Sequence, residues 1–270
     1  MPSEPGDPGS YSGSIIPWTT DMNDENDLIF GLRPLIEAIK AGKSVERILL
    51  KKGLHGSLYY ELVNLIRERG LPYQPVPAER LNQITRKNHQ GVVAWISAIE
   101  FHDLENLLPH IFEKGDDPFL LLLNGISDVR NFGAIARTAE CFGVHGIIIP
   151  EKGAARINAD AVKTSAGALH SIPVCRVKSI VKSLGFLKDS GLRIIATTEK
   201  SDSYIYKYDL TGPSVVILGS EERGISRELL ALADCQMSIP IGGKTGSLNV
   251  SVAAGIILYE IMKQRTQAIL

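Results

Sequence analysis

The sequence has few cysteines, few aromatic residues and no apolar run long enough to cross a membrane. Its 270 residues include only three cysteines, which are widely spaced at Cys141, Cys175 and Cys235. An odd, scattered set of thiols is typical of reduced cysteines in a cytosol, and the absence of a CxxC pair argues against zinc. No apolar run reaches the roughly 18 residues that a membrane span needs. The first twenty residues lack the basic segment and apolar core of a secretion signal. We therefore expect a cytoplasmic protein with no membrane partner.

The charges are nearly balanced overall but are unevenly distributed. Hydrophobic residues make up 44% and charged residues 22% of the chain, which is ordinary for a globular protein of one or two domains. By position, residues 1–27 carry six acidic and no basic side chains, residues 28–96 five acidic and eleven basic, residues 97–117 six acidic and one basic, and residues 118–270 thirteen acidic and seventeen basic. This asymmetry indicates either a polyanion-binding domain or solvated surfaces beside two acidic connectors, and charge alone leaves both interpretations open.

The composition divides the chain into four parts. Residues 1–26, rich in Gly, Pro, Ser and Asp, predict a flexible acidic tail. Residues 27–98 predict a small α/β domain, with helices at 32–42 and 57–70 and strands at 46–53 and 91–99. The acidic residues 99–117 predict a linker, and residues 118–266 predict a second domain.

The second domain alternates continuous Ile/Val/Leu runs with helical patterns. Strands are predicted at 119–125, 146–150, 172–177, 192–198, 214–220 and 236–241, and a long helix at 249–265. Continuous apolar strands separated by helices favour an α/β fold with a mostly parallel sheet covered on both faces.

Two common phosphate-binding motifs are absent from this domain. No GxGxxG follows its first strand. The segment Gly242–Ser247 contains Gly-Lys-Thr, but a phosphate loop needs a glycine five positions before Gly243, where Ser238 stands. The spacing therefore excludes a nucleotide triphosphatase.

Three glycine-containing loops at predicted strand ends carry the remaining polar groups. Parallel sheets bind ligands at the carboxyl ends of their strands, so these loops are the places to look. The first loop contains Asn131 and is followed by a helix that carries Arg137 two turns later. The second contains Gly219, Glu221 and Gly224, and the third contains Ser247 and Asn249 just before the last helix. Singly, the asparagines and the serine could be helix caps and the glutamate a solvated loop acid. Their occurrence together favours one shared site.

These segments resemble the SpoU family of RNA ribose 2′-O-methyltransferases, within the SPOUT class. The resemblance rests on Asn131-Phe-Gly with Arg137, on Gly219-Ser-Glu-Glu-Arg-Gly, and on the Ser-Leu-Asn-Val-Ser that begins at Ser247, and it covers residues 118–265. One departure is Val129-Arg130, where many members have Asp-Pro. The first domain is similar to the ribosomal-protein-like RNA-binding domain of many members, and its FGLRPLIEAI and HQGVVA segments look most like the 23S rRNA guanosine 2′-O-methyltransferase subgroup.

The resemblance implies a deep trefoil knot in the second domain, S-adenosyl-L-methionine as cofactor, no metal, and a homodimer formed through the catalytic domain. The last helix could be only a core helix, but its small residues Ala253, Ala254 and Gly255 would also allow a partner to approach closely. The residues that the resemblance assigns to the cofactor are Gly219, Ile239, Leu248, Leu218, Thr198 and Ile241.

The resemblance also implies the roles of the catalytic residues. Arg137 would act on the ribose 2′-hydroxyl. Because a guanidinium is practically never a base in proteins, we expect Arg137 to remain a cation that binds the adjacent phosphate and favours the developing alkoxide. Proton abstraction by Arg137 is the second alternative. Asn131 and Asn249 would supply hydrogen bonds, Glu221 would orient the arginine, and Ser247 would help with positioning.

Four residues of the first domain are the expected RNA contacts, namely Arg33, Arg86, Lys87 and His89. A structural turn histidine is an equal alternative for His89. The partner is expected to be ribosomal RNA, with two alternative functions: a tRNA ribose methyltransferase, or a non-catalytic RNA-binding protein of the same fold. The intact Arg137, Glu221 and Asn249 argue against a pure binder.

Overall fold

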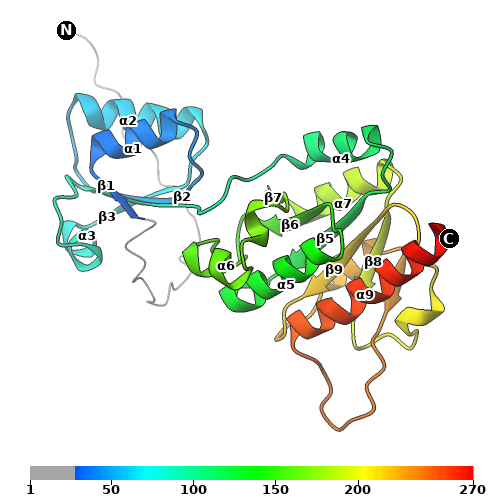
Figure 1. Cartoon of the computed structure of the whole chain (residues 1–270). Helices are drawn as coiled ribbons and strands as arrows, with labels where there is room; N and C mark the ends of the chain where they lie inside the picture. The colour runs from blue at the N-terminus through cyan, green and yellow to red at the C-terminus, as the bar shows by residue number, and fades with distance from the viewer. Residues whose placement is uncertain (1–27, 270) are drawn as a thin grey trace.

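The computed structural model describes residues 28–269, which form two α/β units joined by a connecting segment (Figure 1). The predicted tail of residues 1–26 lies outside the described residues. The front unit consists of β1 (Leu28–Phe30), α1 (Leu32–Lys40), β2 (Val45–Lys51), α2 (Ser57–Glu68), β3 (Tyr73–Val76), α3 (Ala78–Ile84) and β4 (Val92–Ile96).

The front unit is a four-stranded sheet with helices on both faces. Its strand order is β1-β4-β2-β3; β4 runs antiparallel to β1 and β2, whereas β2 and β3 are parallel. Because successive strand side chains point to opposite faces, Ile48 and Leu50 pack toward α1 and α2, and Leu49 packs toward α3. Both layers are buried, as expected for a sheet that is covered on each side.

The segment 99–117 is more than the linker that its acidity predicted, because it contains α4 (Leu104–Glu113). The carboxylate of Asp103 accepts a hydrogen bond from the backbone N–H of Glu105 and caps the helix. Leu104, Leu108 and Ile111 follow helical spacing and are buried in the core of the second unit. The acidic residues occupy the exposed face of this helix, and their number hid its apolar stripe.

The second unit is a parallel six-stranded sheet, as the apolar runs predicted. Its elements are β5 (Phe119–Asn124), α5 (Val129–Cys141), β6 (Gly146–Pro150), α6 (Ala159–Thr164), η2 (Ala168–His170), β7 (Val174–Val177), α7 (Ile180–Asp189), β8 (Arg193–Thr197), η3 (Ile205–Lys207), β9 (Ser214–Gly219), α8 (Arg227–Leu232), β10 (Cys235–Met237) and α9 (Val250–Ile269). The strand order is β10-β8-β9-β5-β6-β7. Helices α5 and α9 pack on one face, and α4, α7 and α8 on the other.

Helix α9 packs along α5 through small residues. Ala254 is fully buried, and a Cβ on Gly255 would lie 3.9 Å from Cγ2 of Thr138 in α5. These small residues were expected to admit a partner subunit. Ala254 lies in the core of its own unit, which fits the alternative of a core helix, and contact of these residues with a partner subunit stays a prediction.

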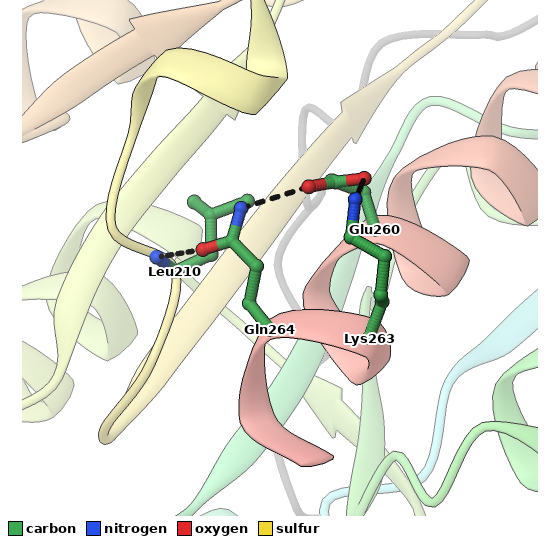
Figure 2. A network of polar contacts seen from close by, with 4 residues as sticks. All are labelled: Leu210, Glu260, Lys263 and Gln264. Atoms are coloured by element: carbon green, nitrogen blue, oxygen red, sulfur yellow. Dashed lines mark hydrogen bonds and ion pairs between the residues drawn. The ribbon is translucent and has the colours of Figure 1, made fainter. Parts of the chain in front are cut away.

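The later turns of α9 are anchored by polar contacts (Figure 2). The side-chain oxygen of Gln264 accepts a hydrogen bond from the backbone N–H of Leu210 at 2.9 Å, and its Nε2 donates to Glu260 at 2.9 Å. Lys263 pairs with the other carboxylate oxygen of Glu260. Arg265 also donates to the backbone carbonyls of Asp117 and Gly212. These contacts fix the helix whose first turn borders the candidate site.

None of the helices within residues 28–269 is long and apolar enough to cross a membrane. The trefoil knot that the resemblance implies depends on how the loops thread through one another, and it stays a prediction.

Candidate active site

The loops at the carboxyl ends of β5, β8, β9 and β10 come together on one edge of the sheet. Strands β6 and β7 lie on one side of β5 in the sheet, whereas β9, β8 and β10 lie on its other side. The strand order therefore reverses between β5 and β9. Open parallel sheets bind ligands at such a reversal.

A pocket of about 220 Å³ lies at this edge. Buried Leu218, Met237 and Ile257 give it an apolar floor. Its rim carries polar side chains from Thr198 and Lys200. Every residue predicted to contact the cofactor lines it, that is Gly219, Ile239, Leu248, Leu218, Thr198 and Ile241, and so do Ser247 and Glu221.

A tight turn places Glu221 at the mouth of this pocket. The backbone N–H of Gly224 donates to the carbonyl of Ser220 at 2.8 Å, and Gly224 has a φ of +63°. A Cβ on Gly219 would lie 2.3 Å from the carbonyl carbon of Gly224, so no other residue fits there without moving the turn. The two glycines are required by the shape of the turn itself.

The carboxylate of Glu221 joins the three loops singled out from the sequence. Its Oε1 accepts hydrogen bonds from Nδ2 of Asn249 at 2.7 Å, from the backbone N–H of Val250 at 3.1 Å and, more weakly, from Nδ2 of Asn131 at 3.5 Å. Nδ2 of Asn249 also donates to Oδ1 of Asn131 at 3.1 Å. Asn131, Glu221 and Asn249 therefore form one polar cluster beside the pocket.

The two asparagines differ in their structural roles. Asp128 caps α5, since its Oδ1 accepts the backbone N–H of Asn131 at 2.7 Å. The side chain of Asn131 is thus free to join the cluster. Asn249 caps α9, because its Oδ1 accepts from the backbone N–H of Ser251 at 3.0 Å and from its hydroxyl at 2.6 Å. Asn249 is therefore a helix cap and a member of the cluster at once.

Arg137 is exposed on α5, two turns beyond Asn131. Within residues 28–269 it makes no ion pair and no hydrogen bond through its side chain, so the predicted pairing of Glu221 with Arg137 does not form. Glu221 instead binds the two asparagines and the first turn of α9. The reason is geometric: Glu221 faces the start of α9, where unpaired backbone N–H groups attract a carboxylate.

The predicted RNA contacts lie on the front unit. Arg33, Arg86 and Lys87 are exposed, and the ammonium of Lys87 lies 5.4 Å from the ring centroid of Phe30. Both ring nitrogens of His89 already have partners.

The ring of His89 has the contacts of a structural histidine. Its Nδ1 accepts the backbone N–H of Gly91 at 3.0 Å, and its Nε2 lies 2.9 Å from Oδ1 of Asn82. These contacts favour the structural alternative for this histidine.

Sequence reasoning missed two cations at the pocket. Lys200 follows β8 and Arg223 lies in the turn after β9, and both line the pocket. Their position after strand ends was a signal that could have identified them. In the described part of the chain, no group of three or more His, Cys, Asp or Glu side chains could hold a metal ion.

Comparisons with known proteins match both units. The sequence profile of the SpoU rRNA Methylase family matches residues 118–259, and that of the RNA 2′-O ribose methyltransferase substrate binding family matches residues 28–102. The Bacillus subtilis protein YacO, named as a TrmH family tRNA/rRNA methyltransferase, is 32% identical over 244 residues, which cover 90% of this chain and 98% of YacO.

Two solved structures are also similar. The SpoU methyltransferase AviRb from Streptomyces viridochromogenes, solved in complex with the cofactor AdoMet, is 26% identical with a TM-score of 0.58, covering 91% of this chain and 96% of AviRb. The A. aeolicus TrmH/SpoU tRNA modifying enzyme is 34% identical with a TM-score of 0.52, covering 56% of this chain and 77% of that enzyme. With its profile match over more than half of its length and with YacO matched almost end to end, the chain belongs to the SpoU family of RNA methyltransferases.

Proposed function

We propose that the protein transfers a methyl group from S-adenosyl-L-methionine to the ribose 2′-hydroxyl of a guanosine in 23S rRNA. The observation that carries this proposal is the meeting of Asn131, Glu221 and Asn249 beside a pocket lined by every predicted cofactor residue. A pure RNA binder would have no need for that arrangement.

The pocket fits the cofactor by its chemistry. An apolar floor of Leu218 and Met237 suits a purine ring, and the polar rim suits ribose and amino-acid groups. The backbone at Gly219, Ile239 and Leu248 would hold it. When bound, S-adenosyl-L-methionine supplies a methyl group already activated by its sulfonium, so this chain has only to place and activate the acceptor hydroxyl.

Arg137 is the residue that we propose to act on the 2′-hydroxyl. Its side chain is exposed and makes no ion pair within residues 28–269, so its charge is available to a phosphate or a developing alkoxide. A guanidinium keeps its proton at neutral pH, which favours electrostatic stabilisation over proton abstraction. Alignment of acceptor and methyl can contribute on the order of 7–11 kcal/mol.

The polar cluster holds the helix that carries this arginine. Asn131 lies in the first turn of α5, and Glu221 and Asn249 connect that turn to the start of α9. Because Glu221 also lines the pocket, we propose that the cluster positions α5, and with it Arg137, relative to the cofactor. We assign Ser247, at the same rim, a minor positioning role.

An apolar stripe on α9 supports the proposed homodimer. Val252, Ile256, Tyr259 and Met262 are between 39% and 58% exposed and follow one another at helical spacing. Exposed apolar side chains in a row favour a protein interface. Because α9 belongs to the second unit, a dimer formed on this face would be built through the catalytic domain.

The front unit favours a ribosomal substrate. The resemblance to the tRNA modifying enzyme covers 56% of this chain, whereas a separate front unit at residues 28–102 matches the RNA 2′-O ribose methyltransferase substrate binding family. A tRNA substrate is the second candidate, because the name of YacO includes both RNAs. We place the activity in the cytoplasm.

The test is a map of 2′-O-methyl groups on 23S rRNA and tRNA from cells with and without this protein. Cells that lack it should lose the modification at one guanosine of 23S rRNA, and the wild-type chain, but not Arg137→Ala, should restore it. A loss confined to tRNA would support the second candidate. No change in any RNA would refute both.

A further inference from the structure

A cluster of arginines lies at the junction of the two units, away from the pocket. Arg47 comes from β2, Arg80 from α3, and Arg156 from the loop between β6 and α6 of the other unit. The guanidinium carbon of Arg47 lies 5.7 Å from the ring centroid of Trp95, and that of Arg156 lies 6.0 Å from it. Trp95 is 7% exposed and forms a shared platform for both.

The cluster gathers like charges where water is partly excluded. All three arginines are half-buried. Burial lowers the pKa of Arg47, and the guanidinium groups of Arg156 and Arg80 lower it further. Within residues 28–269, neither Arg80 nor Arg156 makes an ion pair. Arg47 donates a hydrogen bond to the side chain of Gln74, and Arg80 donates one to that of Gln83. The mutual repulsion of the three positive charges would be reduced by a phosphate group bound among them.

The two units are joined closely enough to set the geometry of this cluster. The backbone N–H of Ala98 donates to the carbonyl of Ile157, the neighbour of Arg156, at 2.9 Å. Arg176 of the second unit pairs with Glu46 of the front unit at 2.9 Å, with both side chains largely buried. Arg156 is therefore held beside the front sheet by backbone and ionic contacts.

The same loop connects the cluster to the catalytic edge. The backbone N–H of Ala155 donates to the carbonyl of Ile126 at 2.8 Å, in the loop that leads to Asn131. In Figure 1, α6 and the start of α5 lie on the side that faces the front unit. A hollow between them is lined by Arg130 and Lys163, together with Asp128 and Asp160. This hollow lies at the first turn of α5, which also carries Asn131 of the polar cluster.

We propose that Arg47, Arg80 and Arg156, which come from both units, form a phosphate-binding site. This site binds the sugar-phosphate backbone of the RNA substrate and directs it toward Arg137. Guanidinium groups suit this role because they bind phosphate oxygens in pairs and stack on an aromatic ring. The inference rests on the proposed function, since it names where the same enzyme holds its substrate.

The test compares Arg156→Gln and Arg80→Gln with Arg67→Gln. Arg67 is exposed on α2, on the opposite face of the front sheet, and makes a matched control. Binding of in vitro transcribed 23S rRNA is measured over a range of KCl concentrations. Each cluster variant should make the plot of log affinity against log salt shallower by about 0.7–0.9, whereas the control should keep the wild-type slope. Arg156→Lys, which keeps the charge, should also keep the slope.

Two results would overturn this inference. One is a slope for Arg156→Gln and Arg80→Gln equal to that of Arg67→Gln. The other is an equal decrease of the slope in Arg156→Lys and Arg156→Gln, which would indicate that Arg156 acts through its packing and not through its charge. A wild-type chain that binds the rRNA with the expected slope but transfers no methyl group would refute the proposed function and leave the phosphate site standing.

Discussion

Substitutions of Asn249 can separate its two functions, because its two polar side-chain atoms have different partners. Oδ1 accepts from Ser251 and caps α9, whereas Nδ2 donates to Glu221 and Asn131. Serine is also a good cap but has no second donor that reaches both partners, and alanine offers neither. Asn249→Ser therefore removes the cluster contacts alone, and Asn249→Ala removes the cap as well.

The expected stability changes follow from the cap. Loss of a cap costs about 1 kcal/mol, which lowers Tm by roughly 2–4 °C in a protein of this size. Asn249→Ala should show this shift, and Asn249→Ser should melt close to wild type. The cluster contacts add little to stability because Asn249 and Glu221 are exposed, and water can replace a lost donor.

The expected activity changes follow from the cluster. Both variants lose the Nδ2 contacts at 2.7 and 3.1 Å that join the α5 turn to Glu221. If positioning of Arg137 is weakened by about 1.4–2.8 kcal/mol in the transition state, methyl transfer falls roughly ten- to a hundredfold. Transfer is measured at saturating RNA and cofactor, beside calorimetric melting. An Asn249→Ser enzyme with wild-type turnover, or activity that follows Tm across both variants, would refute the reasoning.

Three further predictions concern other parts of the chain. Arg137→Ala should bind S-adenosyl-L-methionine nearly as wild type in calorimetry but lose methyl transfer; full activity would remove the arginine from the mechanism. Burial, with a smaller effect of a nearby aspartate, raises the pKa of Cys175 to about 12, so a thiol reagent at pH 7.5 should modify exposed Cys141 first, and equal rates by mass spectrometry would contradict this. Burial lowers the pKa of His145, and this effect is larger than the opposite effect of Asp116, whose carboxylate lies 3.9 Å away. Nδ1 of His145 accepts a hydrogen bond from the backbone N–H of Phe119. Because the folded state favours the neutral imidazole, the full contribution of His145 to the free energy of unfolding should be present above pH 6.5 and should decline as the pH falls below it. His145→Gln should make this decline smaller. An unchanged dependence of stability on pH in the variant would contradict the prediction.

The sequence predicted the fold around the candidate site well where one signal dominates. The apolar runs at 119–125 and 214–220 predicted buried strands in a sheet covered on both faces, and β5 and β9 lie there side by side. Once the sheet is parallel, the loops after its strands must share an edge. The meeting of Asn131 with Glu221 follows from that rule.

The structure departs from prediction where signals compete. Residues 99–117 carry six acidic side chains and one basic one, and this charge led to the prediction of a linker where the structure has the buried stripe of α4. The partner of Glu221 could not be chosen from the sequence, since charge favours Arg137 while the helix start at Val250 offers a free N–H. The arginines around Trp95 come from different units, and only their packing brings them together.

The most direct test of the central claim is to incubate the purified chain with methyl-labelled S-adenosyl-L-methionine and 23S rRNA, digest the RNA to nucleosides and separate them. The account predicts label in 2′-O-methylguanosine for the wild type and almost none for Arg137→Ala. Label on a nucleobase, or an RNA without label although the chain binds the cofactor, would contradict it.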